Sequence, residues 1–116
     1  MLQLTPQTRV FLACEPADFR RGIDGLAALC RQRLNADPMD GAIFVFRNRR
    51  GTSLKLLSYD GQGFWLCQKR LSQGRLSWWP SSAQASERLS ARELQILLWN
   101  GNPKSVVLAE DWRQVA

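Results

Sequence analysis

The sequence predicts one α+β domain spanning residues 1–116, in which a mostly antiparallel sheet of four to five strands carries an amphipathic helix on one face. Length and composition support this, because 116 residues of which 45% are hydrophobic suit a single core. Hydrophobic residues recur with a helical period of about 3.6 before residue 36. Between residues 42 and 79 the period falls to about two, as expected for strands.

The first strand is expected at residues 8–14, where TRVFLAC is rich in β-branched and aromatic residues. Glu15 and Pro16 close it, and Pro16 suits the first turn of a helix. We expect that helix over residues 17–35, because its apolar residues share one face. The face consists of Phe19, Ile23, Leu26, Ala27, Cys30 and Leu34.

Four further strands are expected at residues 42–47, 53–59, 64–71 and 75–79. The short glycine-bearing loops between them are typical of a meander of antiparallel neighbours. Ile43 and Val45 would share one face while Phe44 and Phe46 take the other, so each face of the sheet carries apolar groups. One helix covers only one face, and the other therefore needs the C-terminal segment, a partner or a second copy of the protein.

Residues 81–88 lack periodicity and are expected to form a flexible connector. A short second helix is expected over residues 90–99 near an edge of the sheet, because Ser90 and Glu93 have the spacing of a capping box. Asn100 and Gly101 would end it. In the tail, residues 100–116, the run from Val106 to Leu108 suits a last strand.

The positive charge is concentrated in one third of the chain. Residues 41–80 hold seven basic groups against one acid, a balance of +6, whereas the other 76 residues hold nine of each sign. Such a local surplus attracts polyanions. Arg47, Arg49 and Arg50 lie at a predicted hairpin tip, where guanidinium groups match phosphate oxygens, although a solvated turn is the alternative.

The other members of the predicted nucleic-acid surface lie on neighbouring strands. Trp65 is included because indole faces can stack on bases, although core packing is the stronger alternative for Trp65, Trp78 and Trp79 alike. Trp78 and Trp79 are adjacent and point to opposite faces, so at most one of them joins the basic side. Clustered Arg, Asn or Gln on a recognition helix are missing, so the sequence does not favour base readout. The predicted binding residues are Arg47, Arg49, Arg50, Lys55, Lys69, Arg70, Arg75 and Trp65.

Residue types argue against catalysis. The chain has no histidine, no GxSxG and no GxxxxGK[ST]. Its three cysteines, Cys14, Cys30 and Cys67, form no CxxC pair and are expected to be buried thiols. We therefore expect no catalytic residues, cofactor or metal site, and only a Mg²⁺ cluster of distant carboxylates stays open. No stretch is apolar enough to span a membrane, and a cytoplasmic protein is expected.

Three stretches in fixed order resemble a known family. They read VFLACEPADFRRGIDGLAALC, DGAIFVFRNRRGTSLKLLSYDGQGFWLCQKRLSQGRLSWWP and LSARELQILL, and they cover residues 8 to about 98. The sequence resembles the small accessory protein called TnpB of bacterial insertion sequences of the sixty-six type, which is distinct from the RNA-guided nuclease of that label. The resemblance implies a protein encoded beside a separate transposase that assists transposition.

Together these observations predict a non-catalytic accessory factor of DNA transposition. Its partners would be the DNA backbone, read with little sequence preference, and the transposase of the same element. The alternative is a protein-interaction module that contacts the transposase, or a second copy of itself, without binding DNA directly.

Overall fold

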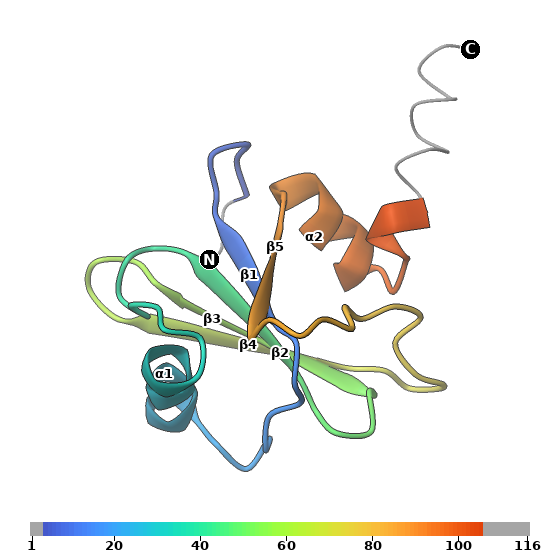
Figure 1. The fold of residues 1–116 in the computed structure, drawn as a ribbon, viewed down its shortest axis with the longest axis horizontal. Coiled ribbons are helices and arrows are strands. Elements are labelled where there is room, and N and C mark those ends of the chain that lie inside the picture. The colour runs from blue at the N-terminus through green and yellow to red at the C-terminus, as the bar shows by residue number, and fades with distance from the viewer. Residues whose placement is uncertain (1–3, 106–116) are drawn as a thin grey trace.

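A computed structural model describes residues 4–105 of the chain (Figure 1). The five strands form one sheet in the order β4-β3-β2-β1-β5. They are β1 (Val10–Ala13), β2 (Ile43–Arg47), β3 (Ser53–Tyr59), β4 (Phe64–Arg70) and β5 (Ser86–Leu89). The α+β class and the strand number are confirmed.

The sheet is mixed, which corrects the predicted arrangement at its first strand. β1 pairs in parallel with β2, whereas all other neighbours are antiparallel. The intervening helix carries the chain back to the start of the sheet, as a parallel connection requires. The meander is therefore confirmed only for β2, β3 and β4.

The fifth strand does not lie where the sequence predicts it. Residues 75–79 form no strand, and the predicted connector at residues 81–88 instead runs into β5, which pairs with β1. Residues 76–79 lie across the sheet, because Leu76 N–H donates to the Gly51 carbonyl at 2.7 Å and the Trp79 indole donates to the Ala13 carbonyl at 3.0 Å. Contacts between distant residues thus override the strand-like composition of this segment.

The helix α1 (Ile23–Gln32) is shorter than the predicted range of 17–35. Before it, the Ala17 N–H donates to the Arg47 carbonyl at 2.9 Å, and this bond holds residue 17 against the sheet outside the helix. Extended backbone at Gly22 then precedes the first turn. After the helix, Asn35 has a positive φ of 52°, which ends helical geometry.

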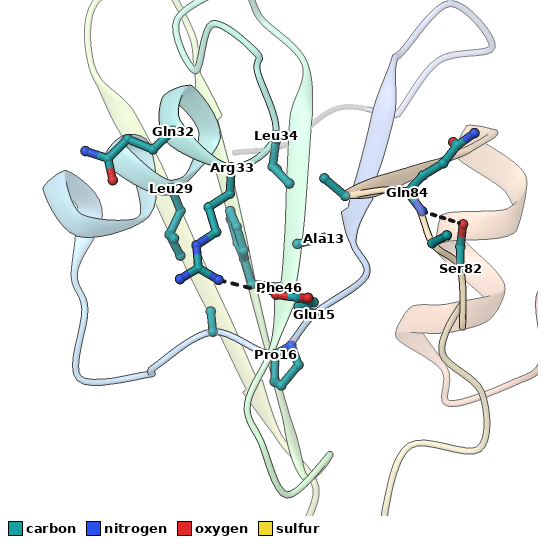
Figure 2. Close-up of a pocket in the computed structure, with 13 residues that line it drawn as sticks. Ala13, Glu15, Pro16, Leu29, Gln32, Arg33, Leu34, Phe46, Ser82 and Gln84 are labelled. Carbon is teal, nitrogen blue, oxygen red and sulfur yellow. Dashed lines mark hydrogen bonds and ion pairs between the residues drawn. The ribbon is translucent and has the colours of Figure 1, made fainter.

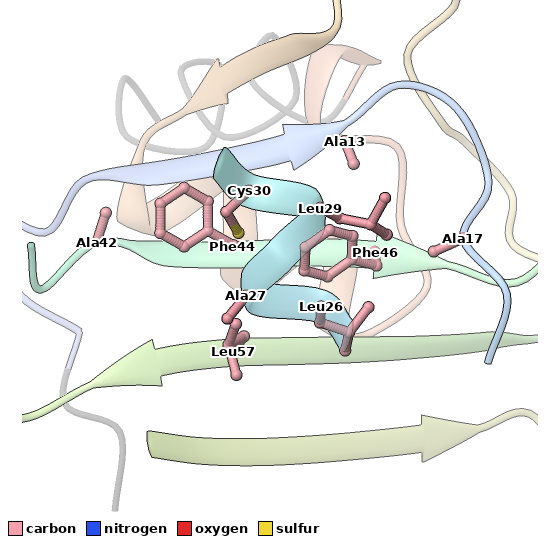
Figure 3. Packing of buried hydrophobic residues seen from close by; sticks show 10 residues of the cluster. All are labelled: Ala13, Ala17, Leu26, Ala27, Leu29, Cys30, Ala42, Phe44, Phe46 and Leu57. Atoms are coloured by element: carbon pink, nitrogen blue, oxygen red, sulfur yellow. The ribbon is translucent and has the colours of Figure 1, made fainter. Parts of the chain in front are cut away.

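α1 covers one face of the sheet (Figure 3). Of the predicted apolar stripe, Ile23, Leu26, Ala27 and Cys30 lie on the helix, whereas Phe19 and Leu34 lie outside it and pack against the same cluster. Leu26 and Cys30 are fully buried against Phe44, Phe46 and Leu57. These three residues come from β2 and β3, so the helix covers the middle of the sheet. The outer strand β4 extends beyond it in Figure 3.

The opposite face is covered from the C-terminal side. The helix α2 (Ala91–Leu98) begins at the predicted capping box, in which Ser90 Oγ accepts from the Glu93 N–H at 3.1 Å and Glu93 Oε1 accepts from the Ser90 N–H at 2.9 Å. Leu94 and Leu97 pack with strand residues on this face, and Trp78 and Trp79 flank them. The C-terminal segment therefore supplies the cover that the second face requires. The strand predicted at residues 106–108 lies outside the described residues.

Candidate nucleic-acid interface

The β2–β3 hairpin presents two arginines on an ordered tip. Asn48 shapes this turn, because its Oδ1 accepts from the Thr52 N–H at 2.8 Å and the Ser53 N–H at 3.1 Å. Gly51 takes a φ of +71°, which glycine adopts without a steric penalty. Arg49 and Arg50 are exposed between these residues. The tip therefore holds both guanidinium groups outward on a defined backbone.

The end of β4 brings two more arginines to the same place. The Leu71 N–H donates to the Thr52 carbonyl at 2.9 Å, and Leu76 bonds Gly51, so the 70–76 segment runs beside the tip. Arg70 and Arg75 at its two ends are exposed. We call this surface the arginine end, and it consists of Arg49, Arg50, Arg70 and Arg75. Among residues 4–105, none of its four guanidinium groups has an ion-pair partner.

Arg47 supports the tip from beneath. Its Nη1 donates to the carbonyls of Asn48 at 3.1 Å and Arg49 at 3.3 Å, and its guanidinium carbon lies 6.0 Å from the Trp79 ring centre. Its Nε is buried without a hydrogen-bond partner in the structure. The predicted phosphate ligand is thus half-buried, and its contacts order the hairpin turn.

Lys55 does not lie on the predicted surface, which corrects the sequence-based assignment. Lys55 is buried on the face of the sheet that α1 covers, and its Nζ donates hydrogen bonds to the Phe19 and Arg21 carbonyls, each at 2.9 Å. The ammonium also lies 4.9 Å from the centre of the Phe19 ring. These groups replace the water that a buried charge loses, so Lys55 fixes the segment before α1 and is withdrawn from solvent.

Lys69 and Trp65 face away from α1, apart from the arginine end. Lys69 Nζ donates to the Leu98 carbonyl, one of the last carbonyls of α2, where a cation is favoured by the helix dipole. Trp65, near the start of β4, is 43% exposed and its indole donates to Asp60 Oδ2 at 2.8 Å. The predicted binding set is therefore divided among several locations.

Arg20, which falls inside the helix predicted at residues 17–35, lies near the tip. A cleft of about 340 Å³ is lined by Arg20 and Asp18 on one side and by Asn48 and Arg49 on the other. Arg20 Nη2 contacts Asp18 Oδ2 at 2.7 Å, and these hydrogen bonds lower the pKa of Asp18 to about 2. The bond between Ala17 and Arg47 and the bonds from Lys55 Nζ bring this segment to the hairpin. All of them join residues 30 or more positions apart, so no local sequence signal marks the segment.

A cavity of about 420 Å³ lies between α1 and residues 82–85 (Figure 2). Arg33 and Glu15 face each other across it, with Nη1 and Oε2 3.3 Å apart. Ser82 accepts a hydrogen bond from the Gln84 N–H, and no histidine exists in the chain to activate it. This lining offers no recognisable catalytic arrangement.

The cysteines and acids are also separated. Cys14 and Cys30 are buried as expected, and burial raises the pKa of Cys30 to about 12, but Cys67 on β4 is exposed and corrects that expectation. Within the described part of the chain, no three His, Cys, Asp or Glu side chains gather closely enough to hold a metal ion. No helix among residues 4–105 is long and apolar enough to cross a bilayer.

Comparison with known proteins identifies the family. Residues 8–106 match the family described as IS66 Orf2 like protein. Two uncharacterized proteins of Sinorhizobium fredii (strain NBRC 101917 / NGR234) are similar: y4hO is 40% identical over 98 residues, 84% of each chain, and y4jC is 39% identical over 90 residues, 78% of this chain and 76% of that relative. No solved structure matches significantly. The chain therefore belongs to the IS66 Orf2-like family, which has an accessory role associated with transposition and no known catalytic activity.

Proposed function

We propose that this protein is a cytoplasmic, non-catalytic accessory factor that binds the DNA backbone through the arginine end. The observation that carries the proposal is the convergence of Arg49, Arg50, Arg70 and Arg75 from two chain segments without ion-pair partners among the described residues. Unpaired guanidinium groups need not break an ion pair to bind phosphate, and their planar forks match the geometry of phosphate oxygens. The family context supplies a DNA-processing reaction in which such binding is useful.

The arginine end suits backbone contacts better than base readout. Its side chains project from a hairpin tip and a neighbouring loop, and neither α1 nor α2 contributes to it. Phosphate contacts position a protein on DNA and carry little sequence information. We therefore expect similar affinity for unrelated sequences and a strong dependence of that affinity on salt.

The test compares two double variants that remove the same charge. Arg49→Gln/Arg50→Gln alters the tip, whereas Arg31→Gln/Arg33→Gln removes two exposed arginines at the end of α1. Arg47 is kept because it orders the turn. Affinity for two unrelated duplexes is measured by fluorescence anisotropy across a salt series, and circular dichroism verifies folding.

Each phosphate contact contributes about 0.9 to the slope of log K against log salt, so the tip variant should flatten the slope by about 2 units on both duplexes. The control variant should leave the slope within about half a unit of wild type. An unchanged slope in a folded tip variant would show that Arg49 and Arg50 belong to a solvated turn.

A protein-interaction function is the second candidate, because Trp99 at the end of α2 is 86% exposed. Exposed tryptophans often anchor protein interfaces. Both sheet faces are covered within the chain, so we place the candidate contact with the transposase at Trp99. If Trp99→Ala abolishes co-purification with the transposase while Arg49→Gln/Arg50→Gln does not change DNA binding, this second function replaces the first.

A further inference from the structure

The outer edge of β4 is an unpaired strand edge in the described chain. β4 has seven residues, it terminates the sheet, and only its inner edge pairs, with β3 (Figure 3). Edge strands this long commonly carry features that prevent pairing with another chain. β4 has no proline or glycine, and its two cations, Lys69 and Arg70, both lie at one end. Its first three residues, Phe64, Trp65 and Leu66, are uncharged, so no charge on this half of β4 hinders pairing with a further strand.

The inner ladder determines which backbone groups face outward. Gly63 and Leu71, which flank β4, bond inward to Asp60 and Thr52. Antiparallel pairing alternates, so the odd-numbered residues from 63 to 71 bond inward and the even-numbered residues direct N–H and C=O groups outward. Phe64, Leu66, Gln68 and Arg70 therefore offer eight outward backbone groups for a further strand.

We propose that β4 pairs in antiparallel fashion with β4 of a second copy, with Cys67 at the centre of the two-fold. In this register Phe64 lies opposite Arg70 and Leu66 opposite Gln68, both as hydrogen-bonded pairs. Trp65 then lies opposite Lys69 as a closer, non-hydrogen-bonded pair. The result is a continuous ten-stranded sheet made from two copies.

The β4 sequence is complementary to itself in this register, which favours a second copy of the protein as the partner strand. All seven residues of β4 find a partner, and each cation meets an aromatic ring of the other copy, an attractive arrangement across strands. A register centred on Gln68 would leave Phe64 and Trp65 outside the ladder, and a register centred on Leu66 would leave Lys69 and Arg70 outside it. The Lys69 ammonium keeps two donors besides the one bound to Leu98, and its alkyl stem can cover the exposed indole of Trp65.

Cys67 provides a direct readout of the register. Residues in a non-hydrogen-bonded pair have Cα atoms about 4.5 Å apart, which lies within the range that a disulfide spans. Cys14 and Cys30 are buried, so Cys67 is the exposed thiol of the described chain. Mild oxidation with copper phenanthroline should link two wild-type chains at Cys67, while Cys67→Ser should stay unlinked.

A shifted cysteine tests the register itself. In Cys67→Ser/Gln68→Cys the two new thiols would be diagonal neighbours about 7 to 8 Å apart, beyond disulfide reach. We therefore expect a cross-link in wild type and none in this double variant. A cross-link that forms only in the double variant would overturn the Cys67-centred pairing.

The association is measured on the full-length protein by sedimentation equilibrium. Trp65→Lys places like charges opposite each other twice in the dimer, whereas Trp65→Glu, which loses the same indole, places opposite charges there. We expect the dissociation constant of the Lys variant to exceed that of the Glu variant by about tenfold or more. A wild-type protein that stays monomeric at about 100 μM, or equal constants for the two variants, would overturn the proposal.

Discussion

Asn48 offers the sharpest test of how the hairpin tip is held. Its side chain makes three hydrogen bonds: Nδ2 donates to Thr52 Oγ1 at 2.9 Å, and Oδ1 accepts from the Thr52 and Ser53 N–H groups. Asn48→Ala removes all three and leaves backbone donors unpaired in a partly buried turn. At about 1 kcal/mol for each bond, we expect the free energy of unfolding to fall by about 2 to 3 kcal/mol.

The matched control is Asn48→Asp, which keeps the acceptor for both N–H groups and loses only the donated bond. The Thr52 hydroxyl can donate to the new carboxylate, so we expect a loss of less than about 1 kcal/mol. Urea unfolding followed by tryptophan fluorescence measures both values, and the slope with urea should stay constant. The reasoning fails if Asn48→Ala loses less than about 0.5 kcal/mol, or if the two variants are equally unstable.

Three further changes test other parts of the molecule. Leu26 is a fully buried residue of α1, so Leu26→Ala should destabilise the protein by about 2 to 5 kcal/mol in urea unfolding, and a loss below about 1 kcal/mol would contradict its place in the core. Ser90→Ala removes the cap of α2 and should lower the free energy of unfolding by about 1 kcal/mol, and no loss in the same assay would contradict the capping role. The Asp18 carboxyl should titrate by NMR near its pKa of about 2, because Arg20 hydrogen-bonds its ionised form, and Arg20→Gln should return this pKa toward 3.8. The stability contributed by the Asp18–Arg20 ion pair is present above the unfolded pKa of Asp18 and is lost as the pH falls through 2. An unchanged Asp18 pKa in Arg20→Gln would argue against this ion pair.

Elements specified by neighbouring residues could be predicted from the sequence. The capping box at Ser90 and Glu93 lies within four residues, and α2 begins where it predicts. The apolar stripe of α1 and the hairpins joining β2, β3 and β4 are likewise set by short-range periodicity and turn residues. The prediction that the helix begins at residue 17 was wrong, because the Ala17 N–H donates to the carbonyl of Arg47, thirty residues away.

The candidate site was predictable in its charge and less so in its geometry. The surplus of +6 in residues 41–80 is a property of the sequence, and the exposed tip arginines follow from the turn. Trp65 and Lys69 illustrate the limit, since both lie on β4 but one is bonded to Asp60 and the other to the end of α2. Alternation along a strand predicts the face of a residue and not the distant group that meets it.

The sequence by itself determined the α+β class, the apolar faces and the location of the excess charge, because composition and short periods specify these. Only the tertiary structure decided which basic side chains are exposed to solvent and which are buried or bonded within the protein. Lys55 is buried because carbonyls 34 and 36 residues away replace its hydration. Arg70 and Arg75 join Arg49 and Arg50 because backbone bonds tie the end of β4 to the hairpin tip. Such contacts depend on how the sheet is ordered, and that order follows from packing of both faces at once.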